Sequence, residues 1–305
     1  MSATEQPPRD RIDSSVPRAG YPGGPGEAGN ATRRRRGLGV SLDETVDATK
    51  VRGFFPLMGE LTTFGGELVR EIPRVRRLGA ETVRQAALIA SGSVLVIMAA
   101  AFFAGGSCGL ESTALARAFG FDPIAGGFSA WCSLREVVPF VFGYILAAKV
   151  GCGIVAELGA MRVSDEVDAL EAMGTRSLAY LAVTRLVACF VVLPIAYLLA
   201  LASSFVAAYL MSVVRFGDVS PGTWKLFFLS FQDEWDVLFS VIKGMVISAW
   251  VVLVALFYGS RVRGGPVEVG IATARSMAVS VVGVTTISML GTLVFWGANS
   301  RIPIG

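Results

Sequence analysis

The densest group of charged side chains with a defined spacing lies in residues 157–174, which read ELGAMRVSDEVDALEAMG. Carboxylates stand at Asp165, Glu166, Asp168 and Glu171, and an apolar run of membrane length lies on each side of the segment. A short acidic segment on the rim of a set of membrane helices has one leading use. It docks a soluble partner and carries the motion of that partner into the membrane.

Other chemistries are excluded by what the sequence lacks. It contains no histidine, which removes Ser-His-Asp catalysis, histidine proton relays and histidine metal sites. Its four cysteines show no CxxC spacing, so we expect no zinc site. No G-x-x-x-x-G-K-[ST] motif occurs. We therefore expect no cofactor, no metal and no nucleic acid on this chain, and any driving nucleotide must bind another polypeptide.

The acidic segment has the features of a short amphipathic helix. Ser164 is a good N-cap, and Gly174 can end the helix in the left-handed conformation. Val167, Leu170 and Met173 recur every three residues and so share one face. Because an isolated helix of this length is marginal in water, something must pack against it. The residues alone leave two candidates, the ends of the membrane helices or a partner protein.

The composition predicts the elements that hold this segment. The 305 residues are 53% hydrophobic with a mean hydropathy of +0.60, and the apolar residues gather in runs of about 20, enough to cross a bilayer. We predict an all-α membrane protein without internal repeats. The expected spans are about 86–104, 136–157, 181–212, 237–259 and 276–297, in a permease domain over 86–300.

The N-terminal region differs in composition. Residues 1–40 are rich in Pro, Gly and charge, lack the apolar core of a signal peptide, and are expected to be a disordered basic tail, either solvated or touching anionic lipid. Residues 41–85 are expected to hold an interfacial helix. Its apolar residues recur at helical spacing from 54 onward. The alternative is a cytoplasmic helix packed on the protein itself.

Basic residues in the short flanks predict the orientation. One side of the membrane carries Arg70, Arg74, Arg76, Arg77, Arg84, Arg162, Arg176, Arg185, Arg261, Arg263 and Arg275. The other carries Arg117, Arg135, Arg215, Lys225 and Arg301. The richer side should be cytoplasmic, which places the N-terminus and the acidic segment inside and the C-terminus outside.

Two lysines fall within predicted spans. Lys149, with Gly151 beside it, either lines a lipid cavity and attracts a polar lipid group or snorkels to the cytoplasmic edge. The distance to that edge favours snorkelling. Lys243 lies nearer the outer end of its span and is also expected to snorkel.

Two features are assigned to the outer side. Cys108 and Cys132 fall in the first outward loop, where a disulfide is possible, but two free thiols are the favoured prediction. Cys152 and Cys189 are expected to be small packing residues. The acids at 233, 234 and 236 are expected in a solvated loop, with contact to an outer partner as the alternative.

These residues resemble the signature of the MlaE/YrbE permease family. The resemblance rests on Glu157-Leu158-Gly159, Met161, residues 165–170, Met173-Gly174, Tyr180-Leu181 and Arg185, and on the later Tyr258-Gly259, Gly264-Gly265-Pro266 and Val269-Gly270. It covers about residues 60–300. The sequence from Leu158 to Arg162 is most similar to B-type YrbE subunits of mammalian-cell-entry (Mce) systems.

The resemblance implies the permease subunit of an ABC-type lipid transporter in a bacterial inner membrane, itself non-catalytic. A cytoplasmic ATPase dimer of the MlaF or MceG type would hold ATP and Mg²⁺ and grip the coupling helix at 164–173. A second YrbE-type permease, extracytoplasmic Mce proteins and membrane lipids would be the other partners. The implied coupling residues are Glu157, Gly159, Met161, Val163, Asp165, Glu166, Val167, Asp168, Leu170, Met173 and Gly174. The implied cargo is a fatty acid, sterol or phospholipid.

Three other functions compete with this interpretation. A secondary transporter would need no ATPase, but such folds use repeats and deep acids that the spans do not show. An intramembrane lipid-modifying enzyme is disfavoured by the absence of histidine and of a clustered acid pair. A passive scaffold for surface proteins would assemble without transporting anything.

Overall fold

The computed structural model describes residues 54–73, 79–174, 177–217 and 219–297, and all the regular structure within them is helical. The α-helices are α3 (Phe54–Glu71), α4 (Gly79–Ala118), α5 (Ala125–Trp131), α6 (Val138–Leu146), α7 (Cys152–Val163), α8 (Glu166–Ala172), α9 (Thr184–Tyr209), α10 (Pro221–Ser230), α11 (Glu234–Ser260) and α12 (Pro266–Trp296). Shorter helical pieces join them: the 3₁₀ turn η4 (Asp122–Ile124) and the π-helical segments η5 (Cys132–Val137), η6 (Ala147–Gly151), η7 (Leu178–Val183) and η8 (Leu210–Arg215). The tail at 1–40 and residues 41–53 lie outside the described part.

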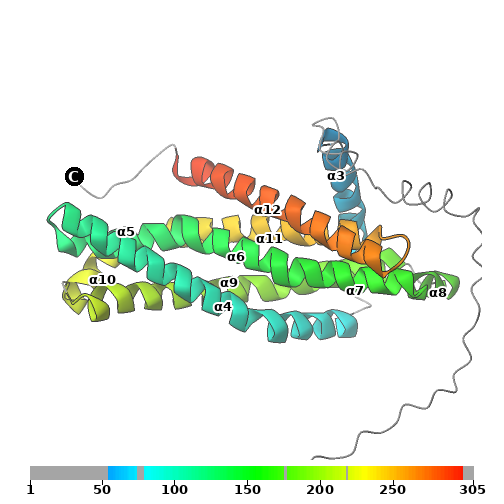
Figure 1. The fold of residues 1–305 in the computed structure, drawn as a ribbon, viewed down its shortest axis with the longest axis horizontal. Coiled ribbons are helices and arrows are strands. Elements are labelled where there is room, and N and C mark those ends of the chain that lie inside the picture. The colour runs from blue at the N-terminus through cyan, green and yellow to red at the C-terminus, as the bar shows by residue number, and fades with distance from the viewer. Residues whose placement is uncertain (1–53, 74–78, 175–176, 218, 298–305) are drawn as a thin grey trace, which may run out of the picture. The chain divides into compact units, whose positions relative to one another are not determined.

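Five helical segments among the described residues are long and apolar enough to cross a membrane. They span Gly79–Ala118, Asp122–Val163, Tyr180–Arg215, Trp235–Ser260 and Pro266–Trp296. The prediction of an all-α membrane protein with five spans is therefore confirmed. Figure 1 shows these segments side by side, with α8 at one end of the bundle and α5 and α10 at the other.

The helices extend beyond the apolar runs that predicted them. The segment after 104 was expected to be an outward loop, but α4 continues to Ala118, and a tight turn at Gly120 leads into the next helices. A hydropathy window of membrane length does not detect these additional turns, because they are rich in Gly, Ser and Ala rather than in large apolar residues. α12 likewise starts at Pro266, well before the apolar run begins.

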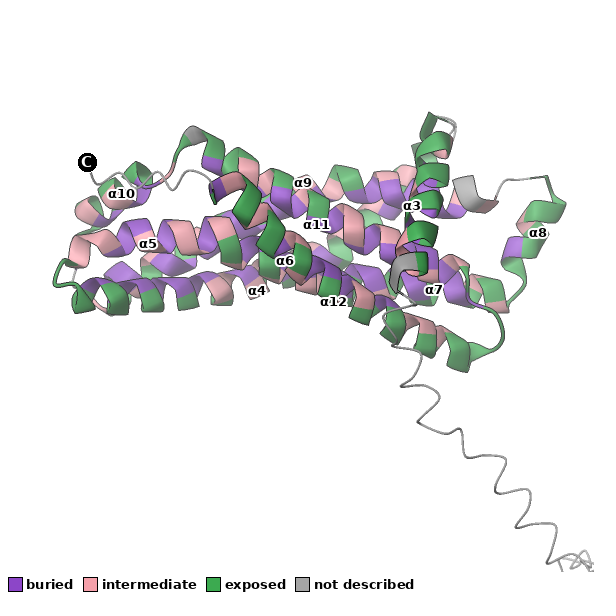
Figure 2. Ribbon diagram, turned by 90° about the horizontal axis from the view of Figure 1, so that it is seen from above, coloured by how far each residue is buried: buried purple, intermediate pink, exposed green. Residues whose placement is uncertain are grey.

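Small residues let α4 and α9 approach each other. The buried face of α4 carries Ile97, Ala101, Gly105, Cys108 and Ser112, a stripe at helical spacing that packs along α9. Close backbone approach through small side chains is the usual way in which membrane helices associate. Figure 2 shows the buried residues facing the middle of the bundle and the exposed ones facing outward.

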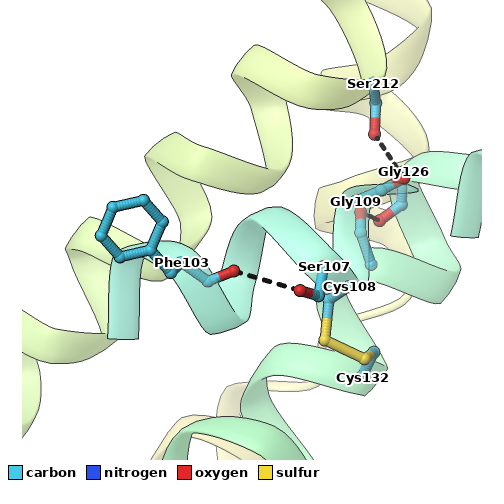
Figure 3. The surroundings of a disulfide bond; sticks show 8 residues. Phe103, Ser107, Cys108, Gly109, Gly126, Cys132 and Ser212 are labelled. Carbon is cyan, nitrogen blue, oxygen red and sulfur yellow. Dashed lines mark hydrogen bonds between the residues drawn. A yellow bond between two sulfur atoms is a disulfide. The ribbon is translucent and has the colours of Figure 1, made fainter. Parts of the chain in front are cut away.

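A disulfide joins α4 to the start of η5. Cys108 and Cys132 are bonded, with their Cα atoms 5.8 Å apart, and Figure 3 shows the bond between the two helices. The favoured prediction of two free thiols is therefore wrong. The reason is that the expected outward loop is helical, so the turn at Gly120 folds the two cysteines back against each other. Cys152 and Cys189 remain thiols.

Residues Met58–Gly305 form one compact unit, which includes most of α3. Leu61, Phe64 and Leu68 are buried along one face of α3, and the Phe64 ring meets Phe257 of α11 edge-on, 5.7 Å between centroids. The other face of α3 is largely exposed. One apolar face of α3 therefore packs on the bundle, and the interfacial position of this helix stays a prediction.

Candidate functional site

The acidic helix exists, but its start differs from the predicted one. α8 begins at Glu166, and the Ser164 hydroxyl donates back to the carbonyl of Ala160 (3.1 Å) rather than capping α8. Ser164 therefore belongs to the end of α7. The break between the helices falls at Asp165, which has a φ of 58° and is the one described non-glycine residue with positive φ. Short polar side chains such as Asp tolerate this conformation best after glycine.

The faces of α8 divide as the spacing predicted, except at its end. Val167 is buried, Leu170 is half-buried, and Met173 is 72% exposed. Asp165, Glu166, Asp168 and Glu171 are all exposed, and Glu171 accepts a hydrogen bond from Ser177. Gly174 ends the helix with a φ of 77°, as expected. Val167 thus packs α8 against its own chain, while the acids and Met173 are exposed to solvent.

A buried arginine joins α7, the helix that leads into α8, to α9. Nη2 of Arg185, at the start of α9, lies 2.9 Å from a carboxylate oxygen of Glu157 on α7. The Arg185 side chain is only 3% exposed, whereas that of Glu157 is 49% exposed. Arg185 also donates to the carbonyl of Leu181 (2.8 Å), and its Nη2 lies 4.0 Å from the sulfur of Met161. The signature residues Glu157, Met161 and Arg185 therefore form one cross-link between α7 and α9.

The opposite side of α7 packs on the turn between α11 and α12. A Cβ on Gly159 would lie 2.9 Å from Cγ1 of Val269 and 3.3 Å from Cγ2 of Val262. Leu158 next to it is buried against Gly259. Both sequence motifs that carry the family resemblance therefore meet at α7. Val163 is half-buried at the end of the same helix.

The two residues proposed for a lipid cavity are not close to this cluster. Lys149 is exposed on η6. Gly151 is buried, and a Cβ there would lie 3.4 Å from Val251 of α11, in ordinary van der Waals contact. Gly151 thus lies in a helix–helix contact of this chain, and the cavity roles of both residues stay predictions.

A second polar cluster lies in the other half of the bundle, and no sequence motif indicates it. The ammonium of Lys243 on α11 is fully buried and does not snorkel, which corrects the expectation for this residue. It donates to the carbonyl of Arg135 (2.7 Å) and to the hydroxyl of Thr292 (2.6 Å), and it pairs with Glu136 at 3.3 Å. Thr292 donates in turn to Glu136. The only sequence signal was an unpartnered lysine within an apolar run.

One of the acids expected in a solvated loop, Asp236, is buried, whereas Asp233 is exposed as expected. Asp236 is 5% exposed and accepts hydrogen bonds from Arg135 (3.0 Å) and from the indole N–H of Trp296 (2.6 Å). It is therefore part of the protein interior, not of a solvated loop. The prediction failed because both partners are distant in sequence, on η5 and at the end of α12.

A groove of about 520 Å³ opens beside this cluster, between α6 and α12. Its lining includes Glu136, Phe140, Ser288, Met289, Thr292 and Trp296. The walls are mainly apolar, and the carboxylate of Glu136, 49% exposed, supplies a charged group at its surface. This arrangement suits an amphiphile with an alkyl chain and a polar group. Among the described residues no group of His, Cys, Asp and Glu could hold a metal ion.

A bundle with five segments of membrane length, a solvent-exposed acidic helix at one end and a groove of about 520 Å³ in its other half is the architecture of a membrane transport protein rather than of a soluble enzyme. A family model described as Permease MlaE matches residues 82–294. The chain belongs to the MlaE family of ABC transporter permeases, which confirms the resemblance read from its motifs.

Curated relatives agree with this assignment. A protein of Synechocystis named "Probable ABC transporter permease protein" is 28% identical, over 61% of this chain and 72% of its own length. The chloroplastic protein TRIGALACTOSYLDIACYLGLYCEROL 1 of Arabidopsis thaliana is 27% identical, over 65% of this chain and 59% of its own. The intermembrane phospholipid transport system permease protein MlaE of Haemophilus influenzae is 25% identical, over 74% of this chain and 87% of its own.

Proposed function

We propose that this chain is the membrane subunit of an ABC-type lipid transporter, and that α8 is the helix through which a separate ATPase drives it. The observation that carries the proposal is the contrast between the two surfaces of α8. Its acids and Met173 are exposed, while Val167 is buried and α8 packs against α7, whose Glu157 pairs with the buried Arg185 of α9. A helix held in this way presents a surface for a partner and cannot move without moving the membrane helices.

The route of that motion follows from the contacts of α7. The Glu157–Arg185 ion pair connects α7 to α9, and Gly159 lies against Val262 and Val269 at the α11–α12 turn. A push on α8 is therefore delivered to three membrane helices at once. Because packed helices are stiff, the displacement passes along them toward the groove in the other half of the bundle.

The groove is the part of this chain best suited to hold a lipid. Phe140, Met289 and Leu293 give it apolar walls, and Glu136, Thr292 and Ser288 give it a polar strip. An acyl chain lies against the first set, and a head group with hydroxyl or ammonium donors lies against the second. Phospholipid is the favoured cargo, since a relative of this chain is named for intermembrane phospholipid transport; fatty acids and sterols fit the apolar walls but use less of the polar strip.

The remaining parts of the transporter come from other chains. ATP and Mg²⁺ are held by the ATPase, the α8 end faces the cytoplasm, and the α5–α10 end faces outward. A cytoplasmic α8 end agrees with the arginines there, among them Arg162, Arg185, Arg261 and Arg263. A second permease chain completes the membrane part, and extracytoplasmic Mce proteins receive or deliver the lipid.

The decisive experiment reverses the charge of α8. The variant Glu166→Lys/Asp168→Lys keeps helical backbone positions and exposed side chains, so the chain should fold. The full complex is then purified in mild detergent, and the ATPase and bound phospholipid are measured by mass spectrometry. We expect loss of the ATPase from the complex. The matched control is Glu111→Lys, an exposed acid near the far end of α4, which should retain it.

Two outcomes would contradict the proposal. Full retention of the ATPase by the charge-reversed complex would show that α8 is not the docking helix. Lipid transport that persists in cells after the ATPase is deleted would favour an ATP-independent transporter instead. Loss of transport together with the ATPase, while the remaining subunits stay assembled, would argue against a passive scaffold.

A further inference from the structure

Asp236 occupies an unusual position between the two walls of the groove. It lies at the start of α11, is 5% exposed, and is not among the groove-lining residues. Its Oδ2 accepts from Arg135 Nη2 at 3.0 Å and from the backbone N–H of Asp233 at 3.3 Å, and its Oδ1 accepts from Trp296 Nε1 at 2.6 Å. The Asp236 carboxylate thus connects Arg135 of η5, the neighbour of Glu136 in the chain, to Trp296 of α12.

Stacking strengthens this connection. The Arg135 guanidinium lies over the ring of Trp131, 4.6 Å from its centroid, and 5.5 Å from the centroid of Trp296. The cation is therefore enclosed by two indoles and the carboxylate. Hydrogen bonds between charged groups are shorter and stronger than neutral ones, and this effect increases away from water.

The same face of α11 holds the backbone of η5. Asp236, Ser240 and Lys243 follow one another at helical spacing. The hydroxyl of Ser240 donates to the carbonyl of Leu134 at 2.6 Å, and Lys243 donates to the carbonyl of Arg135 at 2.7 Å. π-Helical segments often occur at functional sites. Here the side chains of α11 bind two carbonyls of such a segment and fix the direction in which Glu136 projects.

From these contacts we infer that Asp236 is a positioning residue for lipid binding: it sets the spacing of the groove walls by joining Arg135 on one side to Trp296 on the other. The inference rests on the proposed lipid-binding role of the groove. Asp236 touches no lipid itself. It keeps Glu136 and Trp296 at the separation that the head group and the first part of the acyl chain require.

The test uses the full complex in vesicles of phosphatidylethanolamine and phosphatidylglycerol. A photo-crosslinking amino acid replaces Met289, a 70% exposed groove residue, and lipid adducts are counted by mass spectrometry as the lipid is diluted with detergent. A second probe at Val206, which is 53% exposed on α9 and outside the groove, reports general lipid contact. The half-saturating lipid fraction at Met289 is compared between variants.

We expect Asp236→Asn to raise that fraction roughly tenfold. The carboxylate accepts from Arg135, Trp296 and the backbone N–H of Asp233 with two oxygens, whereas the amide has one accepting oxygen and its NH₂ group faces the remaining donors. Trp296→Phe should raise it by a similar factor. The double variant should go no further than the larger single effect, since both changes break the same Arg135–Asp236–Trp296 link between the groove walls. Adducts at Val206 should not change in any variant.

The matched control is Trp250→Phe. The indole N–H of Trp250 makes no hydrogen bond. This change therefore exchanges an indole ring for a phenyl ring, as Trp296→Phe does, but breaks no hydrogen bond. It should leave the Met289 titration unaltered. If Asp236→Asn and Trp296→Phe titrate like the parent, the positioning role is overturned while the groove remains a lipid site. If the parent itself shows no more adduct at Met289 than at Val206, the groove assignment fails, and the inference fails with it.

Discussion

The carboxylate of Glu157 and the guanidinium of Arg185 meet at 2.9 Å with very different exposures, 49% and 3% of the side chains respectively. The cation is the buried partner, and it depends on the anion for compensation of its charge. Glu157 has water on its other side. The ion pair joins α7, the helix that leads into α8, to α9. Its asymmetry determines which of the two substitutions costs more stability.

Replacing Glu157 should cost more stability than replacing Arg185. Glu157→Gln leaves a buried guanidinium without a counter-charge, at a cost of roughly 1.5–3 kcal/mol. Arg185→Met leaves an acid that water can solvate. Thermal unfolding of the detergent-purified complex measures both, and Glu157→Gln/Arg185→Met should recover part of the loss. Equal stability of the two single variants would show that the pair is not asymmetric.

Asp165 should tolerate glycine but not a β-branched residue. Its φ of 58° strains Asp165→Val by about 1–2 kcal/mol, whereas Asp165→Gly relieves strain. The same valine at Glu166, the first helical residue of α8, is the control and should change little. Co-purification of the ATPase with each variant gives the measurement. A fully retained ATPase in Asp165→Val would show that the direction of α8 is unimportant.

Replacing Gly159 by alanine should lower the stability of the protein. In Gly159→Ala the new Cβ lies 2.9 Å from Val269, so the α11–α12 turn must shift, at a cost of about 1–3 kcal/mol. Val269→Ala removes the obstructing methyl groups and should restore part of the stability. Gly153→Ala is the control, because nothing lies within 4 Å of a Cβ at that position. The midpoint of thermal unfolding decides whether Gly159 differs from Gly153.

The Cys108–Cys132 disulfide should stabilise the end of the bundle that carries η5. It closes a loop with a sequence separation of 24, for which a stabilisation of about 2–4 kcal/mol is typical. Cys108→Ser/Cys132→Ser should therefore lower the unfolding temperature, and a reductant should lower that of the parent but not that of the variant. Cys152→Ser leaves the disulfide intact, so this variant should respond to the reductant like the parent.

Local properties of the sequence predicted much of the structure. Apolar runs gave the number and order of the spans, because each run must satisfy its own backbone in lipid and therefore forms a helix. Gly174 marked the end of the acidic helix, and the helical spacing of Val167 relative to the neighbouring acids predicted its buried and exposed faces. The family signature could be read because each of its two motifs is a short local stretch, residues 157–185 and 258–270.

The tertiary structure alone decided the roles of Lys243, Asp236 and the two outer cysteines. Lys243 meets Glu136 across 107 residues of sequence, Arg135 meets Asp236 across 101, and Trp296 meets Asp236 across 60. From the sequence alone, each of these charged side chains is expected near water, because its desolvation costs free energy and no partner lies close to it in the chain. Only the packing of η5, α11 and α12 brings the partners together and makes burial of these charges possible. The groove therefore could not be predicted from the chain in its linear order.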